Sequence, residues 1–118
     1  MTARDLATRG ARVILACRDL TKGEAAAEWI REYLGTGQAK VEVARLDLSS
    51  FSSVRQFCRD LAAREARLDL LVNNAGIMFA PRAITEDGQE RTLQTNHLGH
   101  FLLTNLLRNL LEAAEKAR

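Results

Sequence analysis

Hydrophobic and polar positions along the chain predict three strands, each followed by a helix. Residues 12–17 form a short apolar run of the kind found in strands that are buried on both faces. Residues 40–46 alternate in the manner of a second strand, and residues 70–73 form a third apolar run. Strands that are separated by helices favour a parallel sheet, so the pattern predicts a doubly wound α/β fold.

Capping signals and apolar spacing place the first two helices. Residues 1–9 resemble the last turns of a helix that Gly10 closes in a left-handed conformation. The sequence Thr21-Lys22-Gly23-Glu24 matches a capping box and predicts a helix to about Leu34, which Gly35-Thr36-Gly37 then breaks. The inward-facing residues of this helix are expected to be Ala26, Ala27, Ile30 and Leu34.

Two further helices are predicted from apolar residues at helical spacing. One begins at about Ser50 and the other covers residues 87–115, after a loop that contains the only proline. The inward face of the first is expected to hold Val54, Phe57, Cys58, Leu61 and Ala62. The stripe of the second is expected to hold Leu93, Leu103, Leu106, Leu107, Leu110, Leu111 and Ala114.

Composition and charge narrow the class of protein. The chain has 118 residues with 47% hydrophobic and 27% charged residues, which predicts one soluble domain over residues 1–118. A net charge of +2 gives no argument for a nucleic-acid partner. No segment has the run of about 20 apolar residues that a membrane span needs, and charged residues among the first twelve argue against a signal peptide. Cys17 and Cys58 lack metal-binding spacing, so free buried thiols and no metal site are expected.

Polar residues follow each predicted strand, where ligands bind in folds of this class. Arg18 follows the first strand and could clamp a phosphate, or it could be an ordinary surface arginine. Asp47 follows the second and could accept from an exocyclic amine, or it could cap the next helix. Ala75 and Gly76, after the third, could let a flat ligand approach the backbone, or form a plain turn. Their convergence at one edge predicts a ligand site.

Asn96 lies on the apolar stripe of the last predicted helix, although its side chain is polar. An amide in that position needs hydrogen-bond partners, so it is either a structural link or part of a site. His97 and His100 flank it, and such a pair more often serves packing or capping than catalysis. The helix offers no third ligand that would indicate a metal site.

Four segments together resemble one enzyme family. They are NNAG at 73–76, LDLSS at 46–50, GARVILACRD at 10–19 and TNHLGHFLLT at 95–104. The set is similar to the short-chain dehydrogenase/reductase family, and to its retinol dehydrogenase branch in particular. The resemblance implies a partial Rossmann-type doubly wound parallel sheet that contains strands 2–4 of that fold and binds a nicotinamide cofactor.

The resemblance also implies a cofactor and a reaction. NADP(H) is expected because Arg18 would bind the 2′-phosphate, while Cys17 stands where NAD enzymes carry a carboxylate. The reaction would transfer a hydride between NADP(H) and an alcohol or carbonyl carbon on an apolar substrate such as a retinoid. Asn96 would be the catalytic asparagine, which helps to hold the water and lysine of a proton relay. The remaining implied contacts are Asp47 and Leu48 to the adenine, Asn74, Ala75 and Gly76 to the adenosine ribose, and Asn73 to neighbouring backbone across the sheet.

Several residues that the family uses are not found in this sequence. No glycine-rich phosphate loop precedes Gly10, and the only tyrosine, Tyr33, has Gly37 rather than lysine four residues later. We therefore interpret the chain as a fragment of an oxidoreductase, without strand 1 and the catalytic half. Such a fragment is expected to be inactive and to fold poorly alone, because strand 1 would lie between strands 2 and 4. The alternatives are a non-catalytic nucleotide-binding or interaction product, or an unstable product without function.

Partners and location are only partly indicated. The expected partner is the apolar substrate, with no nucleic acid, and pairing of two copies through the last helix is left open. Many relatives of this branch are held at the endoplasmic reticulum by an N-terminal apolar segment. The sequence itself assigns no compartment.

Overall fold

A computed structural model describes residues 2–35 and 40–118, which group into two compact units. The first unit ends at Leu46, and the second runs from Asp47 to Arg118. Among the predicted features, Met1 and the helix-breaking pair Thr36 and Gly37 lie outside the described residues.

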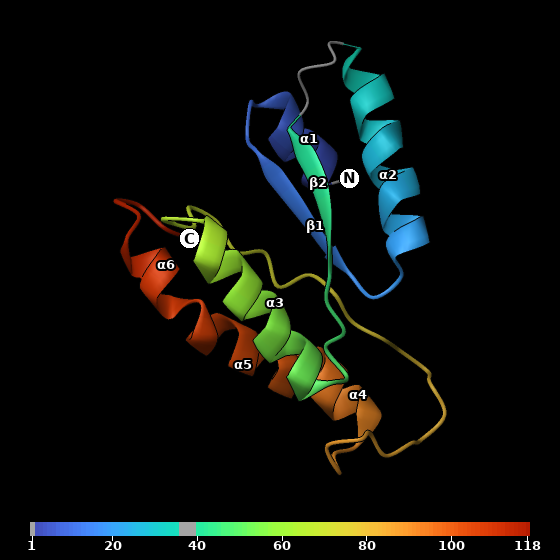
Figure 1. The fold of residues 1–118 in the computed structure, drawn as a ribbon. Helices are drawn as coiled ribbons and strands as arrows, with labels where there is room; N and C mark the ends of the chain where they lie inside the picture. The colour runs from blue at the N-terminus through green and yellow to red at the C-terminus, as the bar shows by residue number, and fades with distance from the viewer. Residues whose placement is uncertain (1, 36–39) are drawn as a thin grey trace. The chain divides into compact units, whose positions relative to one another are not determined.

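The first unit contains a two-stranded parallel sheet (Figure 1). Strand β1 (Val13–Cys17) pairs with β2 (Val41–Arg45) in a register that matches Val13 with Val41 and Cys17 with Arg45. Helix α2 (Leu20–Leu34) connects the strands, and α1 (Thr2–Thr8) precedes them. The predicted parallel strand–helix–strand unit is confirmed, as is the left-handed Gly10 after α1, with a φ of 86°.

The core of this unit lies on one face of the sheet, where alternate residues of both strands meet the two helices. In α2 the buried positions are Gly23, Ala27 and Ile30, which follow one another at helical spacing. Ala26, predicted to face inward, is exposed because it lies one position off this stripe. The cluster consists of Ala7, Val13, Ala27, Ile30 and Val41, with Ala3, Leu6, Leu15, Leu34 and Val43 packed against it.

The start of α2 differs from the predicted capping box. Asp19 is the N-cap, and its carboxylate accepts a hydrogen bond of 3.1 Å from the backbone N–H of Lys22. The helix therefore begins at Leu20, before Thr21. Its end agrees with the prediction, because Gly35 has a φ of 62° and closes the helix with bonds to two carbonyls of the last turn.

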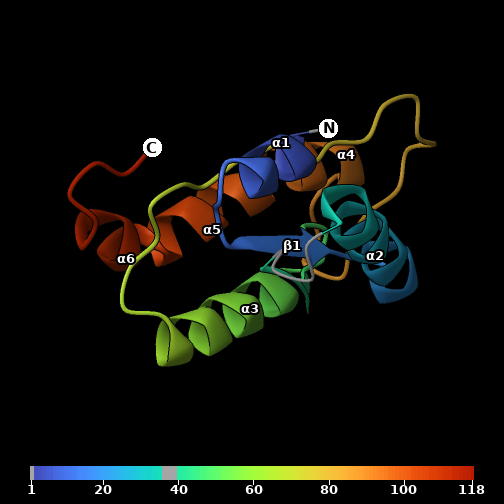
Figure 2. The same cartoon turned by 90° about the horizontal axis from the view of Figure 1, so that it is seen from above.

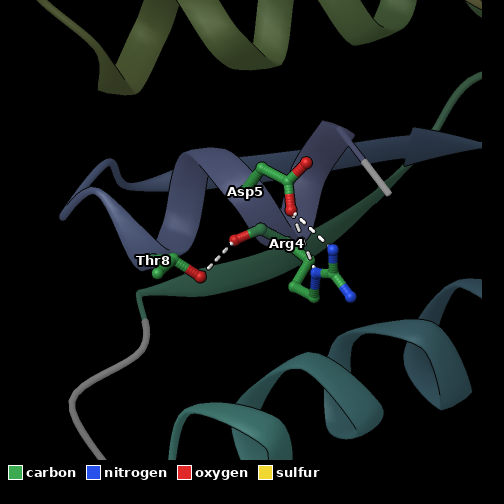
Figure 3. A network of polar contacts seen from close by, with 3 residues as sticks. All are labelled: Arg4, Asp5 and Thr8. Carbon is green, nitrogen blue, oxygen red and sulfur yellow. Dashed lines mark hydrogen bonds and ion pairs between the residues drawn. The ribbon is translucent and has the colours of Figure 1, made fainter.

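Arg4 links α1 to the outer side of α2. Its guanidinium donates bonds of 3.0 and 2.8 Å to Asp5, and Thr8 donates one of 2.9 Å to the Arg4 carbonyl (Figure 3). The same guanidinium lies 5.9 Å from the ring centroid of Trp29 and 5.1 Å from that of Tyr33. The two rings stack with centroids 5.8 Å apart. These cation–π contacts stabilise the packing of the helices although both rings are largely exposed.

Gly23→Ala is expected to destabilise the first unit, although alanine is the better helix former by about 1 kcal/mol. A Cβ at Gly23 would lie 2.4 Å from Sγ of Cys17 and 2.7 Å from Cγ1 of Val43. Overpacking of this kind costs about 1–3 kcal/mol. Urea unfolding of the chain measures the change. Adding Cys17→Ala and Val43→Ala should reverse part of the loss, and a more stable Gly23→Ala protein would contradict the close contact.

The second unit pairs α3 (Phe51–Arg64) with α5 (Gly99–Leu106), and the two helices run alongside each other (Figures 1 and 2). Ser50 caps α3 by accepting from the N–H of Ser53, which confirms the predicted start. Of the predicted inward face, Ala62 is exposed and the other four residues are buried. The buried apolar residues of the unit are Leu48, Val54, Phe57, Cys58, Leu61, Leu103 and Leu107.

The predicted third strand does not form among the described residues. Residues 70–73 belong to an irregular segment with few backbone hydrogen bonds, one of them to the last residue of the chain. The N–H of Leu71 donates to the carbonyl of Arg118 at 2.8 Å, and the N–H of Arg118 donates to that of Asp69 at 3.1 Å. A strand requires a continuous ladder with a neighbour, and no described strand lies in register with this segment.

The predicted last helix is shorter and is divided into four parts. They are α4 (Arg91–Leu93), the π-helical segment η1 (Gln94–Leu98), α5 and α6 (Arg108–Glu112). Residues 85–88 form a turn in which Gly88 has a φ of 75°. The helix was predicted to begin at residue 87, but because of this turn it begins later, at Arg91.

Glu90 caps α4, and the N–H groups of Thr92 and Leu93 hold the pKa of its carboxyl below the usual value. Leu93 and Leu106, both predicted to face inward, are exposed. The π-helical segment changes the angular spacing between Leu93 and the rest of the stripe.

Candidate cofactor site

Two arginines gather at the carboxyl ends of the strands in the first unit. Arg18 directly follows β1, is exposed, and within the described residues its guanidinium forms no hydrogen bond or ion pair. Arg45, the last residue of β2, donates a bond of 3.3 Å to the Arg18 carbonyl. The carboxylate of Asp19 is used in capping α2. This edge therefore offers a guanidinium that is free to bind an anion, with a second one close by.

Cys17 is half-buried between the sheet and α2 and does not form part of this edge. Its Sγ lies 3.5 Å from the Leu15 carbonyl oxygen. The same sulfur faces Gly23 of α2, where an added Cβ would lie 2.4 Å from it. Burial raises the pKa of the Cys17 thiol, and the negative charges of Asp19 and Glu24 raise it further. Cys58 is buried in α3, and burial raises the pKa of its thiol to about 11. Both cysteines are free, as predicted, and remain neutral thiols near pH 7.

Asp47 shapes the loop that leads into α3. Its Oδ1 accepts from the N–H of Ser49 at 2.9 Å and from the Ser49 hydroxyl at 2.6 Å, while its own N–H donates to Oγ of Ser53 at 2.9 Å. The cap of α3 is Ser50. Asp47 therefore does not cap this helix, which was one of the two roles that the sequence left open for it. Among the described residues Oδ2 of Asp47 has no hydrogen-bond partner, which leaves it able to accept from a ligand.

Leu48 packs directly on the first residue of α5. A Cβ at Gly99 would lie 2.5 Å from the carbonyl oxygen of Leu48 and 3.0 Å from its Cβ. This approach requires glycine, and it fixes the loop of Asp47 and Leu48 against the helix that also carries His100.

Asn96 holds the segment that contains the asparagine pair. Its Oδ1 accepts from the N–H of Ile77 at 2.8 Å, and its Nδ2 donates to the carbonyl of the same residue at 2.8 Å. Asn96 is thus a structural link, which is one of the two roles that the sequence left open. It lies in η1, and π-helical segments are frequent at functional sites.

The partners of Asn73 differ from the expected ones. Its Nδ2 donates to Oγ1 of Thr104 at 3.0 Å, and its Oδ1 lies 3.2 Å from Nδ1 of His100. Both partners are side chains of α5 rather than backbone of a neighbouring strand, because no strand pairs with residues 70–73 in the described part of the chain. Nε2 of His100 also lies 2.7 Å from the carbonyl of Ala75. Asn74, Ala75 and Gly76 are exposed on this anchored segment.

Sequence reasoning missed the buried amide of Gln94, whose side chain is 0% exposed. Its Nε2 donates to Oδ2 of Asp87 at 2.7 Å, and its Oε1 accepts from Thr85 at 2.5 Å. The same Asp87 oxygen accepts from the N–H of Phe51 at 2.8 Å, and Ser50 bonds to Glu86. This network joins the turn before α4 to the start of α3. The sequence Thr-Glu-Asp-Gly at 85–88 was an available signal, because those residues favour a turn.

The described residues offer neither a metal site nor a membrane-spanning helix. Among the described residues, no three histidine, cysteine or acidic side chains are close enough to bind a metal ion. In that same part of the chain, no helix combines the length and apolar character needed to cross a bilayer.

Comparison with known proteins decides the family. Residues 1–118 match the short chain dehydrogenase family over their whole length. The chain belongs to this oxidoreductase family. Retinol dehydrogenase 11 from Mus musculus and retinol dehydrogenase 12 from Homo sapiens are each 51% identical to it over 117 residues, which cover 99% of this chain. The chain spans 36% of the length of each.

Solved structures confirm the Rossmann-type fold. The RhlG protein of Pseudomonas aeruginosa, solved as an NADP active-site complex, is 33% identical with a TM-score of 0.71. The match covers 96% of this chain and 43% of RhlG. The predicted partial α/β fold of this short-chain dehydrogenase segment is thereby confirmed.

Proposed function

We propose that this short-chain dehydrogenase segment binds NADP(H) in an oxidoreductase that moves a hydride between the nicotinamide and an alcohol or carbonyl carbon. The observation that carries the proposal is the unpaired guanidinium of Arg18 at the carboxyl end of β1. A 2′-phosphate is the group that distinguishes NADP from NAD, and a planar guanidinium binds it through paired, charge-assisted hydrogen bonds.

Three features of the first unit favour NADP(H) over NAD(H). An enzyme that uses NAD needs a carboxylate at the end of this strand to accept from the ribose hydroxyls. Cys17 occupies that position and is turned toward α2, and the carboxylate of Asp19 is bonded to the backbone of Lys22. Arg45 adds a second positive charge near Arg18.

Residues of the second unit would contact the adenosine part of the cofactor. Asp47 has a free carboxylate oxygen suited to the exocyclic amine of adenine, and Leu48 places the adjoining backbone against α5. Asn74, Ala75 and Gly76 are exposed and would lie beside the ribose. The bound nicotinamide would supply the hydride, while these residues bind and orient the dinucleotide.

Asn96 is proposed to support catalysis through its position next to this segment. Both atoms of its amide bond to the backbone of Ile77, directly after Gly76. In the role that we propose, Asn96 fixes the backbone that borders the reacting groups and helps to order the proton relay. The substrate is proposed to be an apolar alcohol or carbonyl compound of the retinoid type, because the relatives are retinol dehydrogenases.

A chimera tests the proposed function. In mouse retinol dehydrogenase 11, the 117 aligned residues are replaced by those of this chain, and reduction of retinal is followed with NADPH and with NADH. We expect kcat/KM for NADPH to exceed that for NADH by about tenfold or more, since hydrogen bonds to charged groups contribute about 1.5–3 kcal/mol. The unmodified host is the control. An active chimera that uses both cofactors equally would contradict NADP(H) binding by this segment.

A further inference from the structure

His100 contacts the anchored segment with both nitrogens of its ring. Nε2 lies 2.7 Å from the carbonyl oxygen of Ala75, and Nδ1 lies 3.2 Å from Oδ1 of Asn73. The histidine belongs to α5, whereas both of its partners lie in the segment that leads to Gly76. His100 therefore lies within hydrogen-bond distance of this segment at two points.

Thr104 determines which atom of the Asn73 amide faces the histidine. The Thr104 hydroxyl donates its hydrogen to the carbonyl of His100 at 2.8 Å, and a carbonyl can only accept. The Thr104 oxygen must therefore accept from Asn73, whose Nδ2 lies 3.0 Å away. The amide oxygen of Asn73 is left facing His100, an orientation that follows from the network as a whole.

Both partners of the His100 ring are consequently hydrogen-bond acceptors. A neutral imidazole carries one N–H and can donate to only one of them, while an imidazolium can donate to both. We propose that His100 is a positioning residue that, in its protonated form, fixes the cofactor-binding segment by donating from both ring nitrogens. The importance of this segment for binding rests on the proposed function, since Asn74, Ala75 and Gly76 follow the anchor.

The surroundings of the ring make this attachment dependent on pH. No carboxylate bonds to the ring among the described residues, so the proton is held by two uncharged acceptors. Asp69, in the segment that leads to Asn73, pairs with Arg67 at 3.0 Å, and Glu112 of α6 pairs with Arg108 at 2.6 Å. The other titratable groups on α3 are Arg55, Cys58, Arg59, Asp60 and Arg64, of which the first three line a cavity of about 210 Å³ with Leu106. The η1 segment carries His97. The second bond requires a ring that carries a proton on both nitrogens, and the neutral ring cannot form it.

Hydrogen exchange in the chimera measures the attachment directly. Exchange of amides 73–77 is followed by mass spectrometry between about pH 5 and 8, the range in which histidines titrate, with correction for the intrinsic pH dependence. The variants are His100→Gln, whose single side-chain nitrogen carries two N–H donors and does not titrate, and His100→Phe, which has none. His97→Phe is the matched control, because His97 is exposed and has no hydrogen bond within the described residues.

Protection of amides 73–77 in the unsubstituted chimera should fall by about fivefold from the acidic to the alkaline end, the factor that one lost hydrogen bond gives. His100→Gln should keep high protection at every pH, and His100→Phe should show low protection at every pH. His97→Phe should behave like the parent chimera. The proposal would be overturned if protection in the parent chimera did not change with pH. It would also be overturned if His100→Gln and the parent had the same protection at every pH. Because His100→Gln keeps a polar side chain, the comparison survives even if His100→Phe does not fold.

NADPH affinity separates this inference from the proposed function. If both hold, the Kd for NADPH should rise with pH in the parent chimera and stay level in His100→Gln. If protection responds as expected while NADPH binds to none of the proteins, the positioning role of His100 stands and the proposed function fails. A third outcome is that NADPH binds tightly while neither protection nor Kd changes with pH or on substitution of His100. In that case the proposed function stands and the positioning role is wrong.

Discussion

Arg18→Ala in the chimera is expected to raise the KM for NADPH by about 10- to 100-fold and to leave the KM for NADH nearly unchanged. The range corresponds to the loss of a charge-assisted hydrogen bond to phosphate, about 1.5–3 kcal/mol. The effect should be selective because NADH has no 2′-phosphate, and because the Arg18 guanidinium supports no other contact among the described residues. Steady-state kinetics with the two cofactors measure both values.

Arg9→Ala provides the matched control for this experiment. Arg9 is also an exposed arginine of the first unit, but it precedes β1 and so lies at the opposite end of the strand from Arg18. Its removal should change neither KM by more than about twofold, because exposed charges that lie beyond about 10 Å are largely screened by salt. Equal losses for NADPH and NADH in Arg18→Ala would show that Arg18 does not bind the phosphate.

Gly99→Ala is expected to destabilise the second unit by about 3 kcal/mol, with a sign opposite to that predicted by helix propensity. An exposed glycine in a helix is improved by about 1 kcal/mol on replacement by alanine. Here the new Cβ would lie 2.5 Å from the carbonyl oxygen of Leu48 and 3.1 Å from that of Gln94. Both are backbone atoms, so the helix or the loop has to move, and overpacking costs about 1–3 kcal/mol or more. Urea unfolding measures the loss.

Comparison with Gly23→Ala tests the cause of that destabilisation. The contacts at Gly23 are with the ends of the Cys17 and Val43 side chains, which truncation can remove. Truncating Leu48 to alanine should not rescue Gly99→Ala, because the carbonyl oxygen remains in place. Full rescue by Leu48→Ala, or a gain in stability from Gly99→Ala alone, would show that the loop does not pack on α5 as closely as described.

Local patterns in the sequence predicted much of the first unit correctly. The apolar run at 12–17 and the alternation at 40–46 became the two strands, because strands that pair in a buried sheet need little beyond their own apolar residues and one crossover helix. Capping was predicted less exactly. Asp19 and Thr21 are both good N-cap residues, and which of them caps α2 is set by where the chain leaves β1.

Predictions that depended on distant partners were less successful. Residues 70–73 have the composition of a strand, but a strand forms only with a neighbour in register, which is not among the described residues. The helix predicted over 87–115 begins at Arg91, after a turn at Gly88, and it contains a π-helical segment and a break at Leu107. Apolar spacing alone reveals neither the π-helical segment nor the break at Leu107, although Thr-Glu-Asp-Gly at 85–88 does indicate the turn.

The sequence by itself determined the family, the parallel α/β arrangement and the candidate residues Arg18, Asp47, Asn96 and the pair at 73 and 74. Those properties depend on residue type and short-range spacing, which can be read from the sequence without knowledge of the tertiary structure. Only the tertiary structure decided what the amides bond to. Asn96 binds the backbone of Ile77, and Asn73 binds Thr104 and His100, across 19 to 31 residues of chain. A side-chain amide can donate to or accept from many groups, and which of them becomes its partner depends on how the segments are packed.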